Sequence, residues 1–74
     1  MGIDPREATL LTLVALQLKA GKRPQDVLAS VEFKDPHMRE IARGLAGDEN
    51  VSPSAREEAV RIAAWAGLPS PKAA

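Results

Sequence analysis

Few side chains in this chain could do chemistry, and those that could are not arranged as a catalytic or metal-binding set. His37 is the only histidine, and the chain has no cysteine. A metal site built on one imidazole needs carboxylates at ligand spacing, and the nearby Glu32 and Glu40 do not supply them. We therefore predict a protein that is not an enzyme, has no cofactor and no metal, and carries His37 as an exposed surface residue.

Nucleophile and phosphate sites also lack support in the sequence. With one histidine, there is little to activate a serine, and two of the serines precede helices, where they can act as caps. Residues 48–50 form a short acidic stretch without the alternating ligands and the closing glutamate of a calcium loop. The glycines do not form a strand-to-helix phosphate loop. With no tyrosine and one phenylalanine, Phe33, the chain also lacks an aromatic platform for single-stranded nucleic acid.

Charge and cysteine content narrow the classes of partner and the cellular location. Ten basic residues balance ten acidic ones, which weakens any nucleic-acid function because such binding depends on neutralising phosphates. The absence of disulfides in so small a domain favours a reducing, cytoplasmic location. The longest apolar stretch, residues 10–18, is too short for a membrane span of about 20 residues, so we expect no membrane association. Abundant alanine and more arginine than lysine suit a bacterial or phage source.

Helix boundaries are well marked in the sequence. Pairs of a capping residue and a proline begin three helices, with Glu7 expected to reach back to its own helix start and Ser54 with Glu57 as a second capping box. Arg23–Pro24 is a weaker start, and glycines mark the ends. The capping pairs are Asp4–Pro5, Asp35–Pro36 and Ser52–Pro53; the terminating glycines are Gly21, Gly47 and Gly67.

These signals predict an all-α fold: a compact orthogonal bundle of three to four short helices. The apolar residues within each segment follow helical spacing, and Phe33 is expected to fill the core from a loop. We expect a single helical domain over residues 1–68 and a flexible, proline-containing tail over 69–74. The predicted helices span about 5–20, 24–31, 36–46 and 53–66.

The first helix is apolar on more than one side. One face, which suffices for a core, carries Leu10, Leu11, Val14 and Leu18, while Leu13 and Leu16 lie outside it. A helix of this kind is either central in its domain or shared with a partner. We favour contact with a partner protein or with a second copy of the chain, as a homodimer; packing inside the domain and incidental exposure are the alternatives.

Trp65, the only tryptophan, lies off the alanine-rich face of the last helix. One interpretation makes it a clamp for the returning tail, with Leu68, Pro69 or Pro71 against its ring. The other makes it an exposed binding anchor, because tryptophan is enriched at interface hot spots. We favour the clamp and retain Trp65 as a candidate contact.

Two functions follow from these patterns, and the motifs assign the chain to no family. The first is a small protein-binding regulator, an adaptor or inhibitor of phage or mobile-element type, that contacts its partner through Leu13, Leu16 and Trp65. The alternative is a helix-turn-helix DNA-binding protein that uses helix 36–46, with Arg39 and Arg43 facing outward. We favour the regulator because the chain has no net charge.

Overall fold

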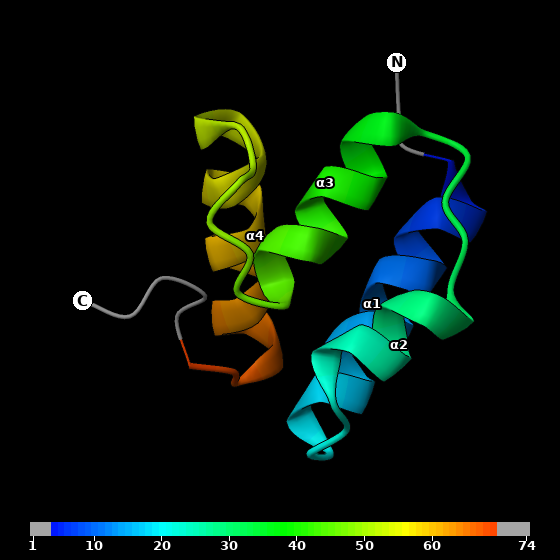
Figure 1. Ribbon diagram of the computed structural model, residues 1–74, viewed down its shortest axis with the longest axis vertical. Helices are drawn as coiled ribbons and strands as arrows, with labels where there is room; N and C mark the ends of the chain where they lie inside the picture. The colour runs from blue at the N-terminus through cyan, green and yellow to red at the C-terminus, as the bar shows by residue number, and fades with distance from the viewer. Residues whose placement is uncertain (1–3, 70–74) are drawn as a thin grey trace.

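The computed structural model describes residues 4–69 and contains four helices in that range. They form a small bundle whose helices are inclined to one another (Figure 1). The all-α prediction is confirmed, since every helix begins at the predicted residue and ends within one residue of the predicted end. Residues 1–3 and most of the predicted tail, 70–74, lie outside the described residues. The helices are α1 (Pro5–Lys19), α2 (Pro24–Ser30), α3 (Pro36–Leu45) and α4 (Pro53–Ala66).

Side-chain caps at three helix starts explain why the starts follow the sequence so closely. An oxygen of each capping residue accepts a backbone N–H that the first turn leaves without a partner. The predicted second capping box at Ser54 and Glu57 is wrong, because both residues lie inside α4 and its cap is Ser52. The cap pairs are Asp4 with Arg6 N, Asp35 with His37 N, and Ser52 with Ala55 N, at 2.9, 2.9 and 3.3 Å.

Glu7 does not cap its own helix, which corrects the sequence prediction. Its Oε1 accepts hydrogen bonds from the backbone N–H groups of Lys34, at 2.9 Å, and Asp35, at 3.3 Å. The side chain is buried, and its Oε2 has no hydrogen-bond partner within the described residues. Glu7 therefore joins the first turn of α1 to the loop that leads into α3, a contact across 27 residues of chain that helix-capping rules do not describe.

The core lies between α1 and the other three helices. Val14, Val27 and Ile41 are its largest fully buried side chains, and each comes from a different helix. Phe33 enters from the loop between α2 and α3 and is buried, as the sequence predicted. Leu10 and Leu18 are partly buried against this cluster. The inner face of α1 is thus fully used by the domain's own core.

Helices α3 and α4 form the most extensive interface in the bundle, and they approach closely because small residues meet there. Gly44 is buried, and a Cβ added to it would lie 2.9 Å from the Cβ of Ala59, closer than two such carbons can pack. The buried face of α4 consists of alanines alone: Ala55, Ala59, Ala63 and Ala66.

We predict that Val14→Ala lowers the free energy of unfolding by about 1–3 kcal/mol. The change removes two buried methyl groups, and the better helix propensity of alanine offsets at most about 0.7 kcal/mol. Val60→Ala is the matched control, because Val60 lies in α4 with 38% of its surface exposed and should change stability by no more than about 0.5 kcal/mol. Urea denaturation measures both; equal effects would mean that Val14 is not a core residue.

A second prediction concerns the contact between α3 and α4. Gly44→Ala should lower the free energy of unfolding by up to about 2 kcal/mol, because overpacking costs about 1–3 kcal/mol and helix propensity returns at most about 1 kcal/mol. Adding Ala59→Gly restores the space, so the double variant should be more stable than the sum of the single effects by at least about 0.5 kcal/mol. Additive effects in denaturation curves would contradict the close approach.

Candidate protein-binding surface

Leu13 and Leu16 lie on the outer face of α1, away from the core. Leu13 is 44% exposed and Leu16 is 50% exposed, whereas Val14 and Ala15 between them are fully buried. Covering exposed apolar side chains of this size lowers the free energy of the complex, so they are candidate contacts. The structure thus places both leucines outside the domain's own core.

Trp65 is also exposed, with 68% of its surface accessible. Leu68 packs against the core cluster and leaves the indole ring uncovered. The clamp that we favoured from the sequence is therefore not formed by Leu68 or Pro69, and Pro71 lies outside the described residues. Trp65 remains available as a candidate contact.

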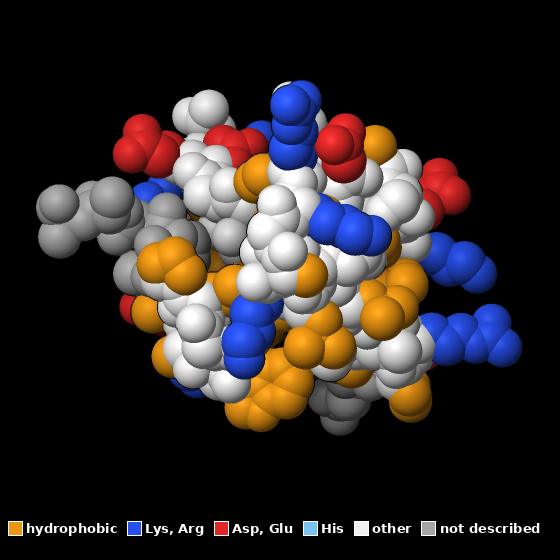
Figure 2. Space-filling model, turned by 90° about the horizontal axis from the view of Figure 1, so that it is seen from below, with side chains coloured by type: hydrophobic (Ala, Val, Ile, Leu, Met, Phe, Trp, Pro, Cys, Tyr) orange, Lys and Arg blue, Asp and Glu red, His pale blue; other side chains and the backbone are white. Residues whose placement is uncertain are grey.

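The C-terminal ends of α1 and α4 lie together, which relates Trp65 to the leucines of α1. A Cβ added to Gly67 would lie 3.4 Å from the Nζ of Lys19, and both helices end in the lower part of Figure 1. Seen from that end, hydrophobic side chains are frequent in the lower half of the molecule, and most acidic side chains lie toward its upper edge (Figure 2). Leu16 and Trp65 thus belong to helix segments at the same end of the bundle.

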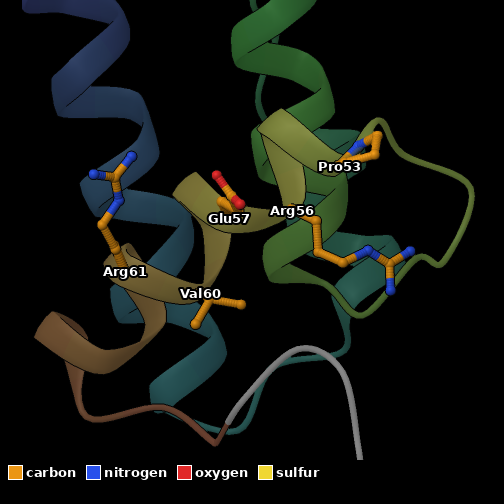
Figure 3. A pocket seen from close by; sticks show the side chains of 5 residues that line it. All are labelled: Pro53, Arg56, Glu57, Val60 and Arg61. Carbon is orange, nitrogen blue, oxygen red and sulfur yellow. The ribbon is translucent and has the colours of Figure 1, made fainter.

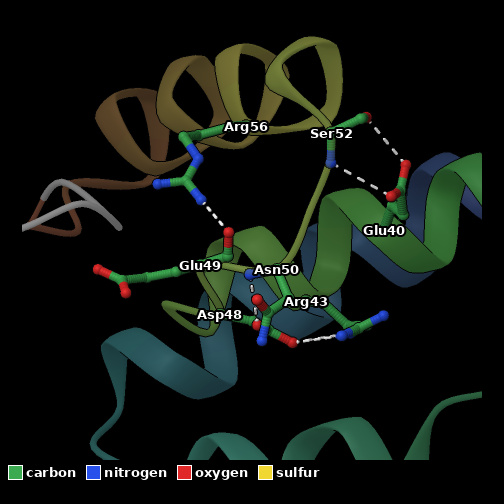
Figure 4. Close-up of polar contacts among 7 residues, drawn as sticks. All are labelled: Glu40, Arg43, Asp48, Glu49, Asn50, Ser52 and Arg56. Carbon is green, nitrogen blue, oxygen red and sulfur yellow. Dashed lines mark hydrogen bonds and ion pairs between the residues drawn. The ribbon is translucent and has the colours of Figure 1, made fainter.

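Arg39 and Arg43, the candidate DNA contacts, are both engaged within the domain. The Nη2 of Arg39 donates to the carbonyl oxygen of Phe33 at 2.9 Å. Arg43 donates to Oδ2 of Asp48 from Nε at 2.9 Å and from Nη2 at 2.6 Å (Figure 4). The Asn50 backbone N–H and the Arg43 side chain together lower the pKa of Asp48 below its ordinary value. Both guanidinium groups therefore have intramolecular partners.

Glu40 connects α3 to the start of α4, a role that the sequence did not reveal. Its Oε1 accepts from the backbone N–H of Ser52 at 3.2 Å, and its Oε2 accepts from the Ser52 hydroxyl at 3.0 Å (Figure 4). Arg56 supports the same linker by donating to the carbonyl oxygen of Glu49. Twelve residues separate Glu40 from Ser52, so no local spacing rule points to this contact.

His37 lies at the surface beside α4, with 40% of its side chain exposed, as expected for a surface residue. Its Nε2 lies 3.3 Å from Oε2 of Glu58, and the pair carries opposite charges only when the imidazole is protonated. Between residues 4 and 69, no three histidine or acidic side chains gather closely enough to hold a metal ion. The arrangement fits a contact between helices.

A shallow depression of about 540 Å³ lies along the outer face of α4 (Figure 3). Pro53, Glu57 and Val60 line it, and the side chains of Arg56 and Arg61 point away from the helix at either side. The lining offers no histidine, serine or cysteine. The ionisable groups of this lining are the carboxylate of Glu57 and the two guanidinium groups.

In residues 4–69, no helix combines the length and the apolar character that crossing a bilayer requires. No family model, no curated protein and no solved structure matches the chain.

Proposed function

We propose that this chain is a small, non-enzymatic, cytoplasmic regulator that acts by binding protein through the outer face of α1. The observation that carries the proposal is the exposure of Leu13 and Leu16, at 44% and 50%, on a helix whose opposite face already completes the core. Because the domain does not need these side chains for its own packing, their cover is best supplied by another polypeptide surface. The absence of cysteine supports a reducing compartment.

Trp65 is the second contact in this proposal. Tryptophan provides a large contact area with little conformational freedom to lose, which is why it is enriched among residues that dominate binding energy. Its segment ends beside that of Leu16, so a partner that covers the C-terminal end of α1 can also reach the end of α4. An adaptor or inhibitor that works by occupying a partner's surface needs no catalytic group.

Protein binding is better supported than DNA binding. Arg39 and Arg43 already donate some of their N–H groups to Phe33 and Asp48, so fewer donors remain for phosphates or bases. Helix α3 packs chiefly against α4, whereas a recognition helix is held by the helix that precedes it. With no net charge, the chain also lacks the electrostatic attraction that drives non-specific binding to DNA.

We predict that replacing Leu13 and Leu16 with glutamine leaves the fold intact and removes binding. Exposed substitutions usually change stability by about 0.5 kcal/mol or less, so the thermal midpoint should stay within a few degrees of the parent. A photoreactive leucine analogue at position 16 should form protein adducts in the cell, and Leu13→Gln should reduce their yield about tenfold, as expected when a central apolar contact is lost.

Two controls make this experiment decisive. Leu11→Gln changes a buried residue of the same helix and should unfold the domain in the same circular dichroism assay. The photoreactive analogue at the exposed Ala29 of α2 should form no specific adduct. Adducts that are absent at position 16, or equally abundant at position 29, would refute the proposed function, as would unfolding of the Leu13 and Leu16 double variant.

We further predict that the purified chain does not distinguish between duplex DNA sequences. At about 50 mM salt, where phosphate contacts are strong, a fluorescence anisotropy titration should show no sub-micromolar binding to any duplex. Arg39→Ala and Arg43→Ala should not change this result. Sub-micromolar, sequence-dependent binding that either variant abolishes would overturn the protein-binding proposal and establish α3 as a DNA-reading helix.

A further inference from the structure

Helix α1 carries two seams of identical spacing on opposite sides. The inner seam is formed by Glu7, Leu11, Val14 and Leu18, at intervals of four, three and four residues, and it faces the domain. The outer seam repeats these intervals two residues later, and a shift of two residues rotates the seam by about 200° around the helix. All four outer residues are exposed: Thr9, Leu13, Leu16 and Ala20. Alternating intervals of three and four are those with which one helix packs against another.

The outer seam has no charge and no polar group in need of a partner. The hydroxyl of Thr9 donates to the carbonyl oxygen of Pro5 at 2.8 Å, and that of Thr12, beside the seam, donates to Ala8 at 3.0 Å. These bonds are made within α1, so covering the threonines does not strand a hydroxyl without a partner. The seam can therefore be covered by an apolar helix face without a desolvation penalty for its side chains.

The order of sizes along the seam is what selects the partner. Two leucines occupy the centre and two small residues, Thr9 and Ala20, occupy the ends, so the seam reads nearly the same in both directions. We infer that α1 pairs antiparallel with α1 of a second copy, about a two-fold axis between Leu13 and Leu16. This inference rests on the proposed function and names the occupant of the same surface.

The two-fold axis produces complementary layers. Leu13 of each copy lies opposite Leu16 of the other, and Thr9 lies opposite Ala20, so large side chains meet at the centre and small ones at the ends. Antiparallel helices also oppose their dipoles favourably. The absence of net charge means that two copies do not repel each other at long range.

The size of the surface indicates a weak, reversible dimer. Helix α1 has 15 residues, so it is about 22 Å long and about 10 Å wide. A contact of these dimensions is smaller than the roughly 800 Å² per partner of a standard stable interface. We therefore expect micromolar self-association.

Sedimentation equilibrium from about 10 µM to about 1 mM, a range that brackets micromolar affinity, tests the pairing. The apparent mass should rise from 7.9 kDa toward twice that value. The double variant with Leu13→Gln and Leu16→Gln should stay monomeric over the same concentration range and keep the circular dichroism spectrum of the parent. A parent chain that stays monomeric, or a double variant that still dimerises, overturns the inference.

Single cysteines test the direction of pairing, because the natural chain has none. Thr9→Cys mixed with Ala20→Cys should cross-link through a short bismaleimide at least about tenfold faster than Thr9→Cys with itself. Equal or reversed rates overturn the antiparallel arrangement. If the parent is monomeric but the photoreactive analogue at position 16 forms adducts with another protein, the dimer is overturned and the proposed function stands. If the parent is monomeric and no adducts form, both the dimer and the proposed function are refuted.

Discussion

The close approach of α3 and α4 is the constraint on which the rest of the structure depends. It requires a residue without a side chain at Gly44 and alanines along the facing side of α4. Because alanines fill little volume, the larger core side chains come from the other elements, with Val14 from α1, Val27 from α2 and Ile41 from α3. The inner face of α1 is thereby committed to the core, and only its outer face is free.

Two glutamates reinforce this arrangement across long stretches of chain. Glu7 accepts hydrogen bonds from the backbone N–H groups of the two residues before α3, Lys34 and Asp35. Glu40 accepts one from the backbone N–H of Ser52 at the start of α4. Each carboxylate satisfies donors that a helix start or loop would otherwise leave unpaired. Together they fix α3 relative to both of its neighbours. Glu7 is buried and Glu40 is partly buried, although both look like surface charges in the sequence.

The fold leaves one face of α1 in the core and the opposite face, with Leu13 and Leu16, exposed. The polar groups of α3 that could have read DNA are engaged in holding loops, since Arg39 contacts Phe33 and Arg43 contacts Asp48. Among the described residues, the large apolar side chains that remain exposed are Leu13, Leu16, Val60 and Trp65. The side chains that are exposed therefore favour binding to an apolar protein surface over binding to DNA.

The sequence by itself determined the helices, because their starts and ends depend on local chemistry. A capping oxygen, a proline in the first turn and a glycine such as Gly67, with φ of 75°, act within a few residues of the boundary that they set. The burial of Val14 and the outward position of Leu13 and Leu16 followed from helical periodicity, and the burial of Phe33 from its apolar character in a polar loop. Only the tertiary structure decided the roles of Glu7, Glu40 and His37 and the exposure of Trp65, because these depend on which distant segments meet, and local spacing carries no information about that.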